Sequence, residues 1–71
     1  MTNNVQSIYA DRMRGWTPEL LYKWIRDSGF MPIKQAHVIG NQIRFRIRMP
    51  DPEKRYYTYV LKNGVHLVIE K

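Results

Sequence analysis

The chain has 71 residues, with twelve Lys and Arg against six Asp and Glu, so its net charge is +6 and its pI is near 10.0. This length allows one domain with a thin core, and a hydrophobic fraction of 44% argues against wholesale disorder. Cysteine is absent, which excludes disulfides, thiolate metal sites and a cysteine nucleophile. The basic charge favours an acidic partner: nucleic acid, an anionic membrane or an acidic protein surface.

Residues 1 to 15 are mostly polar and end in a basic stretch that contains Arg12 and Arg14. We expect a flexible arm, or one that becomes ordered on a partner, although the apolar spacing leaves a short amphipathic helix open. The N-terminus lacks a signal-peptide pattern, and the apolar stretches fall short of the roughly 20 residues that a transmembrane helix needs. The sequence therefore predicts a cytoplasmic protein without membrane contact.

A helix is predicted from Pro18 to Ser28. Thr17 is suited to cap its N-terminus, Pro18 fits the first helical position, and Glu19 complements the positive end of the helix dipole. Gly29 supplies a C-terminal stop. One apolar stripe should face the core, and it consists of Leu20, Leu21, Trp24 and Ile25.

Two hairpin turns are predicted after the helix, at Gly40-Asn41 and at Asn63-Gly64. The proline-rich stretch 50 to 54 reads as a further turn between them. We therefore expect an α+β domain over residues 16 to 71, monomeric when free, in which one helix packs on a four-stranded antiparallel meander. The predicted strands are 33–39, 42–49, 56–62 and 65–70.

The segment 43 to 49 alternates strictly between apolar and cationic side chains. Because successive side chains of a strand point to opposite faces, Phe45 should lie under the helix, and three arginines should form a row on the open face. The predicted register sets Tyr57 beside Arg48 and Tyr59 beside Arg46 on that same face. A guanidinium can pair with phosphate or carboxylate oxygens, and a tyrosine ring can stack on a base or fill an interface pocket.

This face has two interpretations. The plainer one is that Arg and Tyr merely solubilise and stabilise the sheet. The functional one is binding without catalysis, because the two histidines should lie roughly 14 Å apart, too far to share a metal, and the carboxylates form no pair. We thus expect no enzyme, metal or cofactor. The candidate binding residues are Arg44, Arg46, Arg48, Tyr57, Tyr59 and His37 on the sheet, with Arg12, Arg14 and Trp16 on the arm.

In size, charge and layout, carried by the helix region Trp16 to Gly29 and the strand region Gln42 to Lys71, the chain resembles small lytic-phage proteins that bind host RNA polymerase. The resemblance implies a non-enzymatic regulator that inhibits or alters transcription by occupying a surface of the polymerase; it transfers no residue-level role. The alternative is an RNA- or DNA-binding module that uses the Arg/Tyr face. That face is similar to the platform of RNA-recognition folds, but it lacks their glycine-containing basic-aromatic motif.

Overall fold

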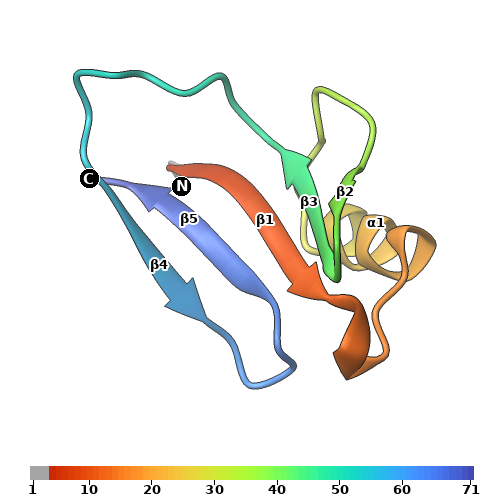
Figure 1. Cartoon of the computed structure of the whole chain (residues 1–71). Coiled ribbons are helices and arrows are strands. Elements are labelled where there is room, and N and C mark those ends of the chain that lie inside the picture. Colours follow the sequence, from red (N-terminus) through yellow and green to blue (C-terminus); the bar gives the residue numbers. More distant parts are fainter. Residues whose placement is uncertain (1–3) are drawn as a thin grey trace.

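The computed structural model describes residues 4 to 71 and shows one helix packed on a five-stranded antiparallel sheet (Figure 1). The order across the sheet is β2-β3-β1-β5-β4. The α+β class and the single helix are confirmed, but the predicted count of four strands is wrong. The strands are β1 (Val5–Asp11), β2 (His37–Ile39), β3 (Gln42–Arg46), β4 (Tyr56–Val60) and β5 (His66–Glu70).

The additional strand, β1, lies in the segment that was predicted to be an arm. It occupies the centre of the sheet and pairs with β3 on one side and with β5 on the other. The structure therefore places residues 5 to 11 within the sheet, while residues 1 to 3 lie outside the described part of the chain. The meander prediction is also wrong, because β1 separates β3 from β5 and β4.

β1 was not predicted because its side chains do not alternate between buried and exposed. Ile8 and Ala10 are fully buried on the helix side, while Gln6 and Ser7 are only 8% and 1% exposed. A strand whose side chains are nearly all buried does not show the alternation that marks a half-exposed strand. A bulge between Val5 and Ser7 further disturbs the period of two.

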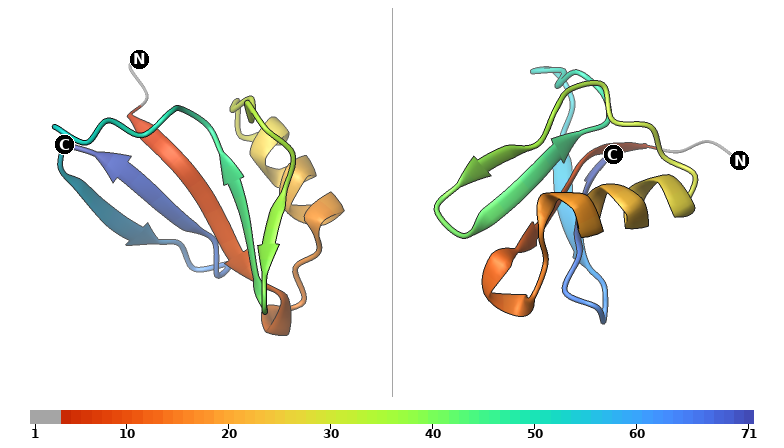
Figure 2. Two further views of the ribbon diagram at one scale, coloured as in Figure 1. Left: turned by 45° about the horizontal axis from the view of Figure 1, so that its top comes forward. Right: turned by 90° about the vertical axis from the view of Figure 1, so that its right-hand side faces the viewer.

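The connection from β3 to β4 crosses the start of β1 and is fastened to it (Figures 1 and 2). The carbonyl oxygen of Gln6 accepts hydrogen bonds from the amides of Ile47 and Arg48, at 2.8 and 3.0 Å. The side-chain amide of Gln6 donates to the carbonyl oxygen of Arg48 at 3.1 Å. This polar clamp leads the chain over β1 instead of letting it turn back beside β3.

The helix α1 (Pro18–Asp27) begins and ends as predicted to within a residue. The hydroxyl of Thr17 accepts a hydrogen bond from the amide of Leu20, and Pro18 takes the first position. Leu21 and Ile25 are fully buried against β1 and β3, whereas Leu20 is 52% exposed and does not belong to the core stripe. A ten-residue helix therefore covers only part of the sheet, and β4 lies beyond it.

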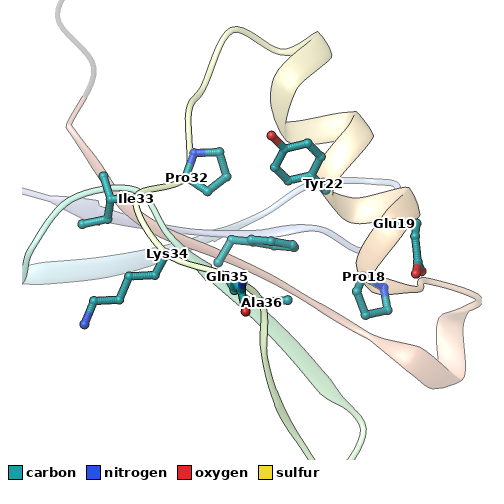
Figure 3. Close-up of a pocket in the computed structure, with 9 residues that line it drawn as sticks. Pro18, Glu19, Tyr22, Pro32, Ile33, Lys34, Gln35 and Ala36 are labelled. Carbon is teal, nitrogen blue, oxygen red and sulfur yellow. The ribbon is translucent and has the colours of Figure 1, made fainter.

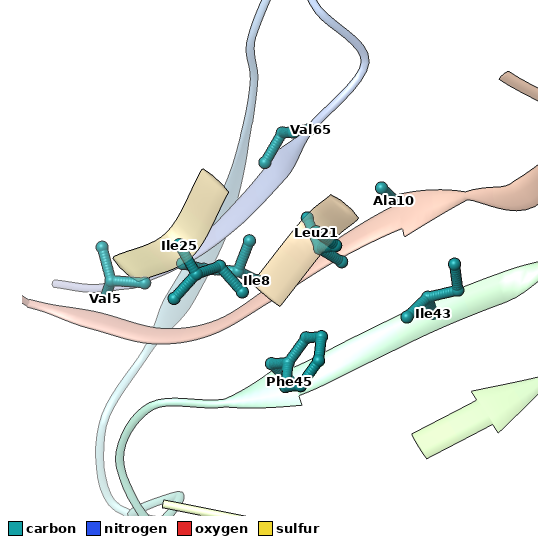
Figure 4. Packing of buried hydrophobic residues seen from close by; sticks show 8 residues of the cluster. All are labelled: Val5, Ile8, Ala10, Leu21, Ile25, Ile43, Phe45 and Val65. Atoms are coloured by element: carbon teal, nitrogen blue, oxygen red, sulfur yellow. The ribbon is translucent and has the colours of Figure 1, made fainter. Parts of the chain in front are cut away.

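The core is a single layer between α1 and the sheet (Figure 4). Phe45 lies under the helix as predicted, 4% exposed, with its ring centroid 5.8 Å from that of Tyr22. Eight buried side chains form this layer: Val5, Ile8, Ala10, Leu21, Ile25, Ile43, Phe45 and Val65.

The two hairpins turn differently. Gly40-Asn41 forms the predicted two-residue turn, with Ile39 opposite Gln42 and Gly40 at φ 58°. The second turn has three residues, Lys62 to Gly64, because the amide of Gly64, at φ 89°, donates to the carbonyl oxygen of Leu61. That extra residue shifts the β4–β5 register by one relative to the prediction, so every β4 side chain changes face.

Ile8→Ala should lower the free energy of unfolding by about 2–5 kcal/mol, because the side chain is fully buried in the central strand and leaves a cavity. Leu20→Ala removes the same number of carbons from a half-exposed helix position and should change stability by about 0.5 kcal/mol or less. Urea unfolding followed by tryptophan fluorescence measures both values. Equal effects of the two substitutions would contradict a central, buried β1.

Candidate functional site

The sheet face opposite the helix carries a row of polar side chains that runs across four neighbouring strands. His37 on β2 pairs with Arg44 on β3, Arg44 with Tyr9 on β1, and Tyr9 with His66 on β5. Directly cross-strand residues share a face, so these four side chains lie together. We call the surface formed by these residues and by Arg46 in the adjacent row the open face; its members are His37, Arg44, Tyr9, His66 and Arg46.

Three of these side chains form a stack. The Arg44 guanidinium carbon lies 4.8 Å from the centroid of the Tyr9 ring, and the rings of Tyr9 and His66 are 4.5 Å apart with an interplanar angle of 11°. Stacking on adjacent strands covers both faces of the Tyr9 ring. The ring is therefore not a free platform for a base, while the tyrosine hydroxyl, the imidazole edge and the guanidinium donors remain as polar contacts.

The row beside this stack contains Arg46, Ser7 and Val68 on adjacent strands. Arg46 is half-buried, and its cross-strand neighbour Ser7 is 1% exposed. Within residues 4 to 71, Ser7 Oγ and His66 Nδ1 are buried side-chain atoms without a hydrogen-bond partner. Buried polar atoms are normally paired with protein or water, but these two atoms are shielded from the surface, so the exposed contacts of the open face come from its other polar groups.

Arg48 has a different role from the other two arginines of the predicted row. It follows the end of β3, and its guanidinium lies 3.5 Å from a carboxylate oxygen of Glu70 on β5. The ion pair offsets its charge and fastens the β3–β4 connection to the sheet, although an exposed pair of this kind contributes only about 0–1 kcal/mol. Arg44 and Arg46 are the two predicted arginines that β3 presents on the open face.

The prediction that two tyrosines lie beside these arginines on the open face is wrong. Tyr57 pairs with Ile69 and Tyr59 with Leu67, so both lie on the helix side of the sheet. They also belong to the far edge strand, which β1 and β5 separate from β3. The one-residue shift in the β4–β5 turn and the insertion of β1 are the two physical reasons for this difference.

The remaining predicted residues, Arg12, Arg14 and Trp16, lie at a corner of the domain and not on an arm. Arg12–Arg14 form a short 3-10 helix, η1, after β1. The indole nitrogen of Trp16 donates to the carbonyl oxygen of Asn63 at 3.1 Å. The guanidinium of Arg14 packs beside Gly64, where a Cβ atom would come within 3.4 Å of it. This corner thus braces the β4–β5 turn.

A separate groove lies between α1 and the segment before β2 (Figure 3). Its volume is about 610 Å³, and apolar side chains dominate its wall, with Glu19 and Lys34 among the lining residues. Tyr22 and Ile33 there are 42% and 49% exposed. The groove offers shape and apolar contact, in contrast to the charged open face.

Within residues 4 to 71, no group of three or more His, Asp or Glu side chains is placed to hold a metal ion. The same part of the chain contains no helix with the length and apolar character to cross a membrane.

Sequence reasoning missed the central member of the site. His37 and Arg44 were predicted on one face, but Tyr9 fell within the predicted arm. The available signal was the β-favouring run from Val5 to Ala10, which contains Val, Ile and Tyr. Two polar residues inside that run concealed it.

Comparison with known proteins finds no matching family model, no matching curated protein and no matching solved structure. The arrangement of the open face is therefore the basis for a functional conclusion.

The stack should be measurable as a coupling between its members. Tyr9→Ala and His66→Ala, made singly and together, should show an interaction energy of about 0.5–1.5 kcal/mol in a double-mutant cycle. His66→Ala combined with Tyr22→Ala, on the helix across the sheet, is the control and should be additive within about 0.5 kcal/mol. Additivity in both cycles would show that the rings do not interact.

Proposed function

We propose that the protein is a small non-enzymatic regulator that binds an acidic surface of a host RNA polymerase through its open face and alters transcription by occupying that surface. The observation that supports binding at this face is the cross-strand alignment of Arg44, Tyr9 and His66, with Arg46 beside them, in a chain of net charge +6. The polymerase as target rests on the resemblance in size, charge and layout.

The stack suits this purpose because it restrains a flexible cation before binding. An unrestrained arginine side chain loses conformational entropy when a partner fixes it. Arg44 lies over Tyr9, and Arg46 is half-buried. Both side chains are therefore already restrained in the folded protein and lose less entropy on binding. A planar guanidinium held in this way can donate two parallel hydrogen bonds to a carboxylate.

An acidic protein surface accounts for the open face better than stacked bases do. Single-stranded nucleic acid is usually bound by aromatic rings whose faces are free to accept a base. Here the Tyr9 ring has Arg44 on one side and His66 on the other. Edge-on polar contacts remain, and these fit carboxylates on a folded partner.

Nucleic acid is the second candidate, because the same donors can contact phosphate oxygens. Arg44, His37 and Arg46 can contact a phosphate backbone without reading its bases. This alternative has a distinct signature. Affinity for nucleic acid should fall log-linearly as salt rises, because bound counterions are released, whereas a mixed protein interface depends less uniformly on salt.

The deciding experiment is capture of partners from a bacterial lysate on the immobilised protein, with and without nuclease. Recovery of polymerase subunits after nuclease treatment would support the proposal. Loss of all captured protein after nuclease would favour the nucleic-acid alternative. A binding titration with purified polymerase at several salt concentrations then gives the salt slope.

Replacing Arg44 and Arg46 together with Ser should weaken polymerase binding by about tenfold for each arginine, since hydrogen bonds to charged groups contribute about 1.5–3 kcal/mol. Lys23→Ser with Arg26→Ser removes the same charge from the helix and should leave binding within about threefold. Unfolding curves confirm that both variants remain folded. Unchanged binding by the folded Arg44 and Arg46 variant would exclude the open face as the interface.

A further inference from the structure

The edge strand β4 is the second exposed feature of the sheet, and its backbone has a regular pattern. The amide of Lys71 donates to the carbonyl oxygen of Arg55, and the amide of Leu61 donates to that of Val65, each at 2.8 Å. Hydrogen-bonding direction alternates along an antiparallel strand. Arg55, Tyr57, Tyr59 and Leu61 therefore bond to β5, while Tyr56, Thr58 and Val60 direct their backbone N–H and C=O groups outward.

This edge lacks the usual devices that prevent further strand pairing. Natural edge strands carry charges, proline or bulges, or are very short. The five residues of β4 include no charged residue and no proline, and their register with β5 shows no bulge. The opposite edge, β2, has only three residues. Tyr57, Tyr59 and Val60 on β4 are 46%, 55% and 58% exposed.

The charges around β4 indicate what it would accept. Alternation places Arg55 and Lys71 on the same face as Tyr57 and Tyr59, and the Lys71 ammonium lies 5.9 Å from the Tyr57 ring. Arg55 and Lys71 are both exposed. The other face of β4 presents Thr58 and Val60, which are uncharged. Nearby Glu70 is paired with Arg48.

We propose that β4 binds an extended peptide segment of a partner as an additional antiparallel strand, with acidic side chains toward Arg55 and Lys71 and apolar side chains toward Thr58 and Val60. Main-chain hydrogen bonds would supply affinity and the two faces would supply specificity. A second copy of this chain is a poorer occupant, because it brings another six positive charges. This inference stands apart from the open face and does not require RNA polymerase.

The test uses a synthetic peptide of alternating glutamate and valine and the full chain, followed by amide hydrogen exchange and NMR titration. Binding should slow exchange of the Tyr56, Thr58 and Val60 amides, while the Tyr57 and Tyr59 amides, already bonded to β5, should change little. A peptide of alternating lysine and valine should bind at least about tenfold more weakly. These exchange and titration measurements use the unmodified protein.

Thr58→Pro removes one outward N–H without breaking a β5 hydrogen bond, because proline is tolerated on edge strands. It should weaken binding of the glutamate-valine peptide by about tenfold or more, whereas Thr58→Val, which keeps the N–H, should not. The Arg44→Ser, Arg46→Ser variant should bind this peptide normally, which separates this inference from the proposed function.

Three results would overturn the inference. The first is peptide-induced change at Tyr9 and Arg44 in place of Tyr56, Thr58 and Val60. The second is the absence of binding at saturating peptide. The third is a dimer in sedimentation of the free protein whose β4 amides are already protected, since that result would make a second copy the occupant.

Discussion

The central position of β1 is the constraint on which the rest of the structure depends. The chain after the helix forms two hairpins, β2–β3 and β4–β5. No strand of one hairpin pairs with a strand of the other. β1 pairs with one strand of each and so joins them into one sheet. It also contributes Ile8 and Ala10 to the core beneath α1. An isolated two-stranded hairpin is marginally stable in water, so both hairpins rely on this one strand.

The same strand organises the open face. Tyr9 lies between Arg44 of one hairpin and His66 of the other, so the stack exists only when both hairpins have docked on β1. The open face and the fold are therefore formed together. The bulged Gln6 adds to this coupling, because its main-chain and side-chain hydrogen bonds hold the long connection that leads to the second hairpin.

The molecule has several distinct exposed surfaces, and the short helix accounts for one of them. Ten residues are enough to cover β1 and β3 but do not reach β4. The far edge, beyond the helix, has exposed tyrosines and outward backbone groups. The helix side also has an apolar groove, and the open face on the opposite side has cationic and stacked aromatic groups. A 71-residue chain in this way presents chemically different surfaces.

The sequence alone determined the features that depend on neighbouring residues: the capped helix at Thr17 and Pro18, the Gly40-Asn41 turn, the burial of Phe45 and the outward direction of Arg44 and Arg46. Tertiary structure decided what depends on distant partners. β1 could not be recognised by its pattern, because the burial of nearly all its side chains is a property of the assembled sheet. The one-residue difference at Gly64 then moved Tyr57 and Tyr59 to the other face, since side chains alternate with a period of two. Residue types thus indicated a cationic sheet face, and long-range pairing decided which aromatic rings share that face.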